Sequence, residues 1–292
     1  MLLSLFRLLS RLPLGLLQAI GGVLGRVVYL LSGRYRERLR ANLARAGLDA
    51  DRLAWAAAAE AGKQQLETAW VWMRPRADFA ARVSWADEPA MRRALDADRA
   101  LILLTPHLGS FEAIAQAYAL RPEARTRPMT VLYRRPRKAA LVPLVERGRE
   151  RDGLLLAPAD LRGVRMLIKA VRSKQAAGIL PDQVPSQGDG VWAPFFGAPA
   201  YTMTLPGRLA SAGAATVLVM GGERLPRGRG FRIHAEPVTE ELTGDPVHDA
   251  TAINRAVERM VLCFPLQYLW GYNRYKCPSG MTRPDVAAAA GP

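Results

Sequence analysis

Short, almost wholly apolar segments constrain the fold of this chain more than any other feature of its sequence. They lie at residues 100–105, 129–133, 177–180 and 215–220, and a further segment, residues 231–237, alternates between apolar and polar side chains. Runs of this length are typical of strands, and continuous runs are typical of strands covered on both faces. The sequence therefore predicts a sheet that is buried between other layers.

Helical segments separate these runs. The spacing of apolar residues predicts helices over residues 111–120, 139–151, 163–172 and 205–212. Further helices are predicted within residues 37–73 and over residues 91–98 and 254–263. Strands that alternate with helices are typical of α/β proteins. We therefore expect a mixed, mostly parallel central sheet flanked by helices.

The N-terminal segment has the composition of a membrane anchor. Residues 12–31 carry one charge, Arg26, and arginines flank them at positions 7, 11, 34, 36, 38 and 40. This length is borderline for a bilayer span, and the arginines favour anionic headgroups. A signal peptide is the alternative, but no small-x-small cleavage site follows. We predict that residues 1–33 form an uncleaved anchor, interfacial or shallowly inserted, with the catalytic part on the cytoplasmic side.

The rest of the chain shows no repeat, linker or composition break. We therefore expect one catalytic domain over residues 34–281, followed by an Ala- and Pro-rich tail, residues 282–292, that is predicted to be disordered. Lys and Arg number 41 against 26 Asp and Glu, a net charge of +15, which indicates an anionic partner. Two cysteines without a neighbouring histidine indicate neither a disulfide framework nor a metal site.

A histidine follows the first apolar run, at the edge where parallel sheets carry functional groups. His107 lies in the segment Thr-Pro-His-Leu-Gly-Ser-Phe-Glu, residues 105–112. It is five positions from Glu112, and on one continuous helix the two side chains would point about 140° apart. If Ser110 caps the following helix, His107 lies in a loop, Glu112 lies in the first turn, and the two converge.

In that arrangement the pair has the chemistry of a general base. Glu112 would accept a hydrogen bond from one imidazole nitrogen, and the other nitrogen of His107 would take a proton from a hydroxyl group. The alternative is a loop histidine beside a solvated glutamate. His234 and His248 are expected to be structural or exposed. The motifs of serine hydrolases, P-loop proteins, dinucleotide-binding proteins and HExxH zinc proteases are missing from the sequence.

The segment 105–112 resembles the HX4(D/E) signature of the lysophospholipid acyltransferase superfamily. More specifically, the chain resembles the lipid A biosynthesis acyltransferases of the lauroyl and myristoyl type, from about residue 5 to about residue 278. Several short blocks match in the right order: residues 132–134, 160–162, 167–169, 181–183, 194–197, 202–204 and 267–270. The chain departs from the family pattern W-x-H-R-R-F-K over residues 270–276. Tyr272 takes the position of the histidine, which leaves the acceptor open.

The resemblance implies an O-acyltransferase that moves a fatty acyl chain from acyl carrier protein to a hydroxyl group of a lipid A precursor, late in lipopolysaccharide biosynthesis. His107 and Glu112 would form the catalytic dyad. The resemblance gives four residues a role in binding substrate: Arg134, Asp182, Gln183 and Arg274. No metal or cofactor is required beyond the acyl-thioester co-substrate. The implied location is the cytoplasmic face of a bacterial inner membrane.

Positions and charges fit these implied roles. Asp182 and Gln183 follow the apolar run at 177–180 and are therefore expected near His107 at the same edge of the sheet. Arg134 follows the run at 129–133. Residues 121–151 hold ten basic and three acidic residues, which would attract an acidic carrier protein or a phosphorylated glycolipid.

Two alternatives stay open. A related acyltransferase that acts on another lipid, such as a lysophospholipid or an aminolipid, would share the histidine, the glutamate and the basic tract. A non-enzymatic basic protein that binds membrane or nucleic acid would share only the charge. We expect no nucleic-acid partner, because the aromatic residues are not interleaved with the basic tracts.

Overall fold

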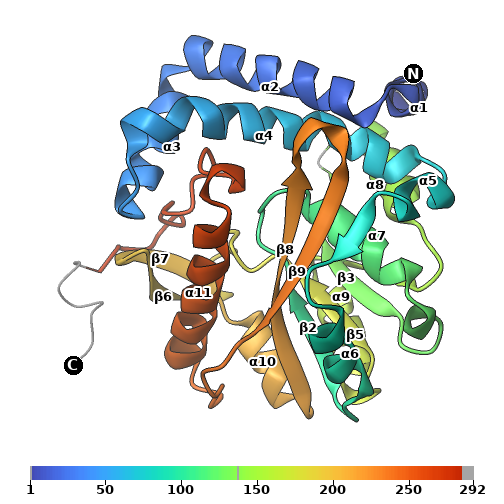
Figure 1. Ribbon diagram of the computed structural model, residues 1–292. Helices are drawn as coiled ribbons and strands as arrows, with labels where there is room; N and C mark the ends of the chain where they lie inside the picture. Colours follow the sequence, from blue (N-terminus) through green and yellow to red (C-terminus); the bar gives the residue numbers. More distant parts are fainter. Residues whose placement is uncertain (1, 137, 285–292) are drawn as a thin grey trace.

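A seven-stranded sheet forms the centre of the computed structural model, which describes residues 2–136 and 138–284 (Figure 1). Neighbouring strands are parallel except for one antiparallel pair, β8 and β9. This arrangement confirms the predicted α/β fold with a mixed, mostly parallel sheet. Across the sheet the strands are β1 (Val83–Trp85), β9 (Gly230–Pro237), β8 (Ala215–Leu225), β2 (Ala100–Leu104), β5 (Ala176–Ile179), β3 (Met129–Tyr133) and β4 (Leu154–Pro158). A separate antiparallel pair consists of β6 (Gly190–Phe195) and β7 (Ala198–Met203).

Helices cover both faces of the sheet and one of its ends. The N-terminal helices are α1 (Leu2–Arg11), α2 (Leu14–Leu31), α3 (Gly33–Arg45), α4 (Ala50–Met73) and α5 (Arg76–Ala80). The others are α6 (Glu88–Asp96), α7 (Phe111–Leu120), α8 (Val142–Arg149), α9 (Leu161–Arg172), α10 (Leu205–Ser211) and α11 (Pro246–Cys263). Short 3₁₀ helices are η1 (Pro122–Arg125), η2 (Ala139–Leu141), η3 (Pro226–Gly228) and η4 (Pro265–Gln267).

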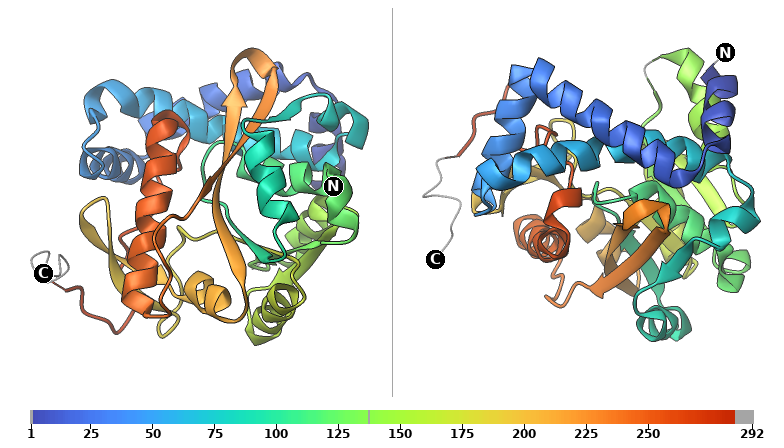
Figure 2. Two further views of the ribbon diagram at one scale, coloured as in Figure 1. Left: turned by 60° about the horizontal axis from the view of Figure 1, so that its bottom comes forward. Right: turned by 45° about the horizontal axis from the view of Figure 1, so that its top comes forward.

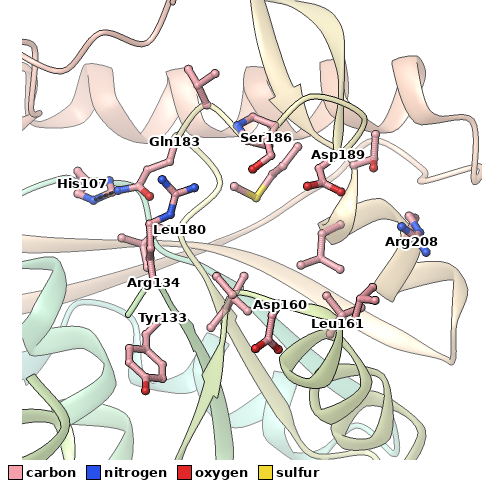
Figure 3. A pocket seen from close by; sticks show the side chains of 18 of the residues that line it. His107, Tyr133, Arg134, Asp160, Leu161, Leu180, Gln183, Ser186, Asp189 and Arg208 are labelled. Atoms are coloured by element: carbon pink, nitrogen blue, oxygen red, sulfur yellow. Dashed lines mark hydrogen bonds between the residues drawn. The ribbon is translucent and has the colours of Figure 1, made fainter. Parts of the chain in front are cut away.

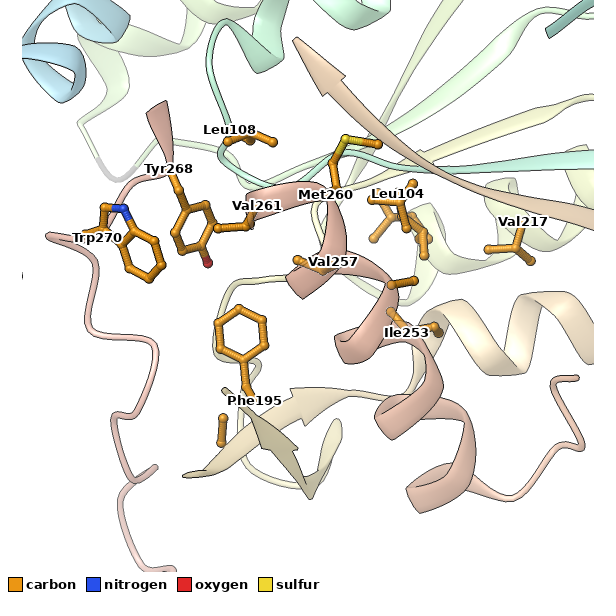
Figure 4. Close-up of a cluster of buried hydrophobic side chains, with 14 of the residues drawn as sticks. Leu104, Leu108, Phe195, Val217, Ile253, Val257, Met260, Val261, Tyr268 and Trp270 are labelled. Atoms are coloured by element: carbon orange, nitrogen blue, oxygen red, sulfur yellow. The ribbon is translucent and has the colours of Figure 1, made fainter. Parts of the chain in front are cut away.

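Strand β2 has a hydrophobic core on each face because its side chains alternate. Ile102 and Leu104 join the cluster that includes residues of α9, α10 and α11 (Figure 4). Leu101 and Leu103 join the cluster that includes residues of α4, α6 and α7. All four side chains are fully buried, and each burial contributes about 1.5–3 kcal/mol. The apolar run in the sequence thus reflects a strand with no solvent-facing side.

Aspartates begin several of the helices that pack on the sheet. The side chain of Asp49 accepts a hydrogen bond from a backbone N–H at the start of α4, and Asp160 and Asp245 do the same for α9 and α11. Each cap satisfies N–H groups that lack a partner within the helix. These caps define where the three helices start.

The N-terminal helices lie across the end of the domain at which β8 and the parallel strands finish. Helix α2 runs along α4 in all views (Figures 1 and 2). Within the described part of the chain it is the one helix that is long and apolar enough to cross a membrane by length and composition, with a mean hydropathy of 1.7. The predicted apolar N-terminal helix is therefore present.

Several element boundaries differ from the prediction. Helix α7 has the predicted bounds, but the helix predicted over residues 139–151 consists of η2 and the shorter α8, and a turn at Gly47, with a φ of +70°, divides the region 37–73. Strands β1, β4 and the β6–β7 pair were not predicted from the sequence. The predicted tail has no helix or strand at residues 282–284, and residues 285–292 lie outside the described residues.

Candidate active site

His107 lies just beyond the carboxyl end of β2, and Asp182 lies just beyond the carboxyl end of the neighbouring strand β5. One oxygen of Asp182 lies 2.9 Å from Nδ1 of the His107 ring. The other oxygen accepts the backbone N–H of His107, also at 2.9 Å. The carboxylate therefore fixes both the position and the orientation of the ring. With Nδ1 protonated, Nε2 is free to act as a base.

The environment of Asp182 keeps it ionised. Burial alone would raise the pKa of this carboxyl, whose side chain is 2% exposed. Electrostatic interaction with His107, the two hydrogen bonds from His107 and the buried Arg274 guanidinium outweigh that effect and lower the pKa of Asp182 below its ordinary value. An ionised carboxylate at this position stabilises a protonated imidazole.

The second ring nitrogen of His107 faces Gln183 and a large cavity. Nε2 lies 3.2 Å from Nε2 of Gln183, and both residues line a cavity of about 620 Å³ (Figure 3). Leu132, Leu161, Leu180 and Met203 supply apolar walls. The cavity is thus large enough for part of an acyl chain and an acceptor group, with the imidazole at its boundary.

The carboxylate of Glu112 is hydrogen-bonded to residues other than His107, which corrects the geometry expected from the sequence. Its carboxylate accepts hydrogen bonds from the Trp72 indole at 3.0 Å and from Nε of Arg149 at 3.0 Å, and Arg149 donates a second bond to the other oxygen. The partner of His107 is Asp182 instead. Within the described residues, His107 and Glu112 share no hydrogen bond.

The direction in which α7 starts explains this correction. Gly109 has a φ of +59°, and a Cβ atom there would collide with the carbonyl oxygen of Gly222. The chain therefore turns sharply before α7, and the first helical residue, Phe111, faces the imidazole with 4.7 Å between ring centroids. Glu112 is about 100° further around the helix. Its side chain consequently points toward α4 and α8.

Glu112 still acts on the cavity through Arg149. The Glu112 carboxylate raises the pKa of Arg149 against the opposing effect of burial, so that the guanidinium remains charged. Arg149 lines the same cavity as His107. Arg149 was not among the predicted site residues, and its position within the basic tract is the one sequence signal that points to it.

The other predicted substrate-binding residues occupy different environments. Arg134 is exposed at the end of β3 and lines the cavity, where its guanidinium lies on the same side as His107 and Gln183 (Figure 3). Arg274 is 2% exposed and donates to the Tyr201 carbonyl at 2.8 Å and the Thr202 hydroxyl at 2.7 Å. Arg274 therefore lies behind Asp182 and holds β7, whereas Arg134 can reach a molecule in the cavity.

Tyr272, at the position where the chain departs from the family pattern, supports the site. Its ring stacks on His107 with 6.5 Å between centroids and 12° between planes. Its hydroxyl accepts the backbone N–H of Val184 at 2.9 Å. Tyr272 therefore anchors the segment that follows Gln183, a function that the sequence alone did not indicate.

Further charged residues line the outer part of the cavity: Asp160, Asp189 and Arg208. Asp160 also caps α9 through Gly163 at 3.0 Å. With Arg134 and Arg149, the cavity wall carries three arginines and two aspartates. An anionic group is therefore favoured near the arginines.

A partly buried, carboxylate-held histidine lies at the carboxyl ends of parallel strands, beside a cavity with apolar walls and several charges; in this arrangement the imidazole can take a proton from a hydroxyl group. Comparison with known proteins identifies the family. Residues 1–277 match the bacterial lipid A biosynthesis acyltransferase family, and the chain belongs to it. The predicted family is thereby confirmed.

Individual relatives are similar to the chain over most of its length. The lipid A biosynthesis palmitoleoyltransferase of Escherichia coli K12 is 27% identical over 224 residues, which cover 74% of this chain and 68% of that protein. The lipid A biosynthesis lauroyltransferase of the same organism is 26% identical over 231 residues, 77% of this chain and 70% of that protein. A lipid A biosynthesis acyltransferase of Haemophilus influenzae is 28% identical over 172 residues, 58% of this chain and 52% of that protein.

Proposed function

We propose that this member of the family transfers a fatty acyl chain from the thioester of acyl carrier protein to a hydroxyl group of a lipid A precursor, as a late acylation of lipopolysaccharide biosynthesis. The observation that carries the proposal is the His107 imidazole, held by Asp182 with its second nitrogen at the cavity. The names of the relatives support the lipid A acceptor. The acyl thioester is the co-substrate, and the reaction uses no further cofactor.

In the proposed reaction His107 is the general base. Its Nε2 takes the proton of the acceptor hydroxyl while the hydroxyl oxygen attacks the thioester carbonyl. The new C–O bond forms, the C–S bond breaks, and the departing thiolate takes the proton from the imidazolium. Gln183 moves off Nε2 to admit the hydroxyl. Asp182 stabilises the imidazolium, as the residue that takes the place the sequence had predicted for Glu112.

In this proposal Glu112 is a positioning residue and Arg149 contacts the substrate. The Glu112 carboxylate holds the Arg149 guanidinium through two hydrogen bonds, and Arg149 faces the reacting carbonyl or a nearby phosphate. Arg134 provides a second positive charge on the same cavity. Fixed positive groups stabilise the oxyanion that develops during attack.

Exposed charges support the proposed acyl carrier protein donor, and an apolar helix supports the proposed membrane attachment. Arg134 is exposed on the cavity wall, and Arg135 and Lys138, which follow it in the sequence, are also exposed; these charges support contact with an acidic carrier protein or a phosphorylated glycolipid. The apolar N-terminal helix supports attachment to the cytoplasmic face of the inner membrane.

The test is acyl transfer by purified protein in detergent or lipid, with acyl carrier protein thioesters as donors and mass spectrometry of the products. His107→Ala should lower transfer to the lipid A precursor at least a thousandfold. The matched control is His234→Ala, because His234 pairs with Glu223 on the β8–β9 hairpin, away from the cavity. Near-normal transfer by His107→Ala would refute the assignment. If the unaltered protein acylates a lysophospholipid or an aminolipid instead of the lipid A precursor, the result would support the alternative of a related acyltransferase that acts on another lipid.

A further inference from the structure

The two N-terminal helices present an apolar outer surface to the solvent. Among the described residues, fifteen large apolar side chains are exposed, and ten of them belong to α1 and α2. We call these ten the outer face: Leu5, Leu8, Leu16, Ile20, Val23, Leu24, Val27, Val28, Leu30 and Leu31. A contiguous apolar surface of this kind marks a contact with a membrane or another protein.

The opposite side of α2 is packed on α4, and at three glycines there is no room for a side chain. A Cβ atom on Gly21 would lie 2.6 Å from the carbonyl oxygen of Gly62, and Cβ atoms on Gly25 and Gly62 would collide with the backbone of the facing helix. The backbones of α2 and α4 therefore touch directly. This contact requires the three glycines and fixes the angle at which α2 crosses the domain.

A buried charged cluster ties the same side of α2 to the sheet. Gln18 donates to the Glu67 carboxylate at 3.0 Å, and Arg224 donates to both Glu67 oxygens at 2.7 and 2.6 Å. Arg224 also binds Glu60 at 2.6 Å. Glu67 is fully buried. If α2 left this position, Gln18 and the charged cluster would become exposed.

We infer that α2 lies flat on an anionic bilayer while docked on α4, with the outer face in the membrane interface, and does not cross the membrane. Of the two possible partners, a membrane or another protein, an anionic bilayer fits the charges around the outer face. Arg7 and Arg11 are exposed on α1, and Arg34 is exposed just beyond the end of α2; their charges can bind lipid phosphates. The aromatic residues Tyr29 and Trp55 are in contact beside it, with Arg26 over the Trp55 ring.

The decisive experiment locks α2 onto α4 by a disulfide. A Cβ atom on Gly22 would lie 3.8 Å from the Cβ of Ala59, which is the usual separation in a disulfide. Gly22→Cys and Ala59→Cys are combined in full-length protein in which Cys263→Ser and Cys277→Ser remove the natural thiols. Flotation with vesicles of phosphatidylglycerol and phosphatidylethanolamine is measured before and after reduction.

The flat geometry predicts that the disulfide forms and that the oxidised and reduced proteins float to within about twofold of each other. If the disulfide does not form, α2 is not docked on α4 as the inference requires. If only the reduced protein binds vesicles, α2 must leave α4 to enter the bilayer. Either result would show that the inference is wrong.

Paired substitutions test the outer face itself. Val23→Asp with Val27→Asp should lower the vesicle-bound fraction at least tenfold, and replacing phosphatidylglycerol with phosphatidylcholine should lower it several-fold. The matched control is Val247→Asp with Leu262→Asp, two exposed apolar residues of α11, which should leave binding unchanged. Equal binding by the two pairs, with circular dichroism showing that both proteins are folded, would overturn the assignment of this surface.

Discussion

Replacing Asp182 by asparagine tests which carboxylate supports His107. Asp182 accepts one hydrogen bond from the His107 ring and one from its backbone N–H. An asparagine amide has one oxygen to accept and one NH₂ group that can only donate. If the oxygen faces the backbone, the NH₂ group donates to Nδ1 and forces the proton onto Nε2. If the oxygen faces the ring, the backbone N–H loses its acceptor.

The first orientation removes the base, because a protonated Nε2 cannot take a proton from the acceptor. General-base catalysis contributes roughly 10²–10⁴-fold. We therefore expect kcat to fall about a thousandfold for Asp182→Asn, equivalent to about 4 kcal/mol in activation free energy. Glu112→Gln keeps an oxygen acceptor for Arg149 and should lower kcat only about tenfold.

The assay is the initial rate of acyl transfer for the two variants, measured beside their free energies of unfolding in denaturant. Asp182→Asn should lower the unfolding free energy by about 1–3 kcal/mol, because the two hydrogen bonds to a charged carboxylate are replaced by weaker bonds to a neutral amide. A thousandfold loss for Glu112→Gln with a small loss for Asp182→Asn would refute the reasoning and restore the dyad expected from the sequence.

Asp182→Asn should also change how the unfolding free energy depends on pH. The pKa of Asp182 is lower in the folded protein than its ordinary value, so its ionisation stabilises the fold fully above a pH of about 4 and progressively less as pH falls through the folded-state pKa. Asp182→Asn should remove this acid-dependent part of the stability curve. An unchanged dependence of unfolding free energy on pH below 4 would contradict the charge assignment.

Three further substitutions test the surroundings of the site. Tyr272→Phe removes the acceptor of the Val184 N–H and should raise KM several-fold while stability falls by about 1 kcal/mol, as steady-state kinetics and denaturation will show. Arg149→Lys keeps the charge but loses the paired hydrogen bonds and should lower kcat/KM at least tenfold in the transfer assay. Arg224→Met leaves the buried Glu67 charge without its partner and should lower the unfolding free energy by about 3–5 kcal/mol; a change below 1 kcal/mol would contradict the buried ion pair.

The sequence was sufficient to predict which strands carry the site. The apolar run that became β2 placed His107 at a strand end, and the run that became β5 placed Asp182 at the same edge. The two strands are neighbours in the sheet, so this part of the prediction followed from strand polarity alone. Strand polarity could not determine which carboxylate binds the imidazole.

Which carboxylate binds the imidazole depends on packing between distant segments, and no local sequence pattern contains this information. The turn at Gly109 determines whether Phe111 or Glu112 faces His107. The position of Arg149 depends on Gly148, where a Cβ atom would lie 2.6 Å from the Trp72 ring. The absence of a side chain there lets α8 approach α4 closely enough for Arg149 to reach Glu112. Contacts between distant segments therefore decided the electrostatics of the site.

The contact between Phe6 of α1 and Trp72 affects how a water-soluble form of this protein should be prepared. The two rings stack with 6.1 Å between centroids, and the indole of Trp72 donates to Glu112, which holds Arg149. Deleting the first thirty or so residues to avoid detergent would uncover Trp72 and loosen this arginine. Inactivity of a shortened protein would then report damage to the reaction centre, and could not be taken as proof that turnover needs lipid.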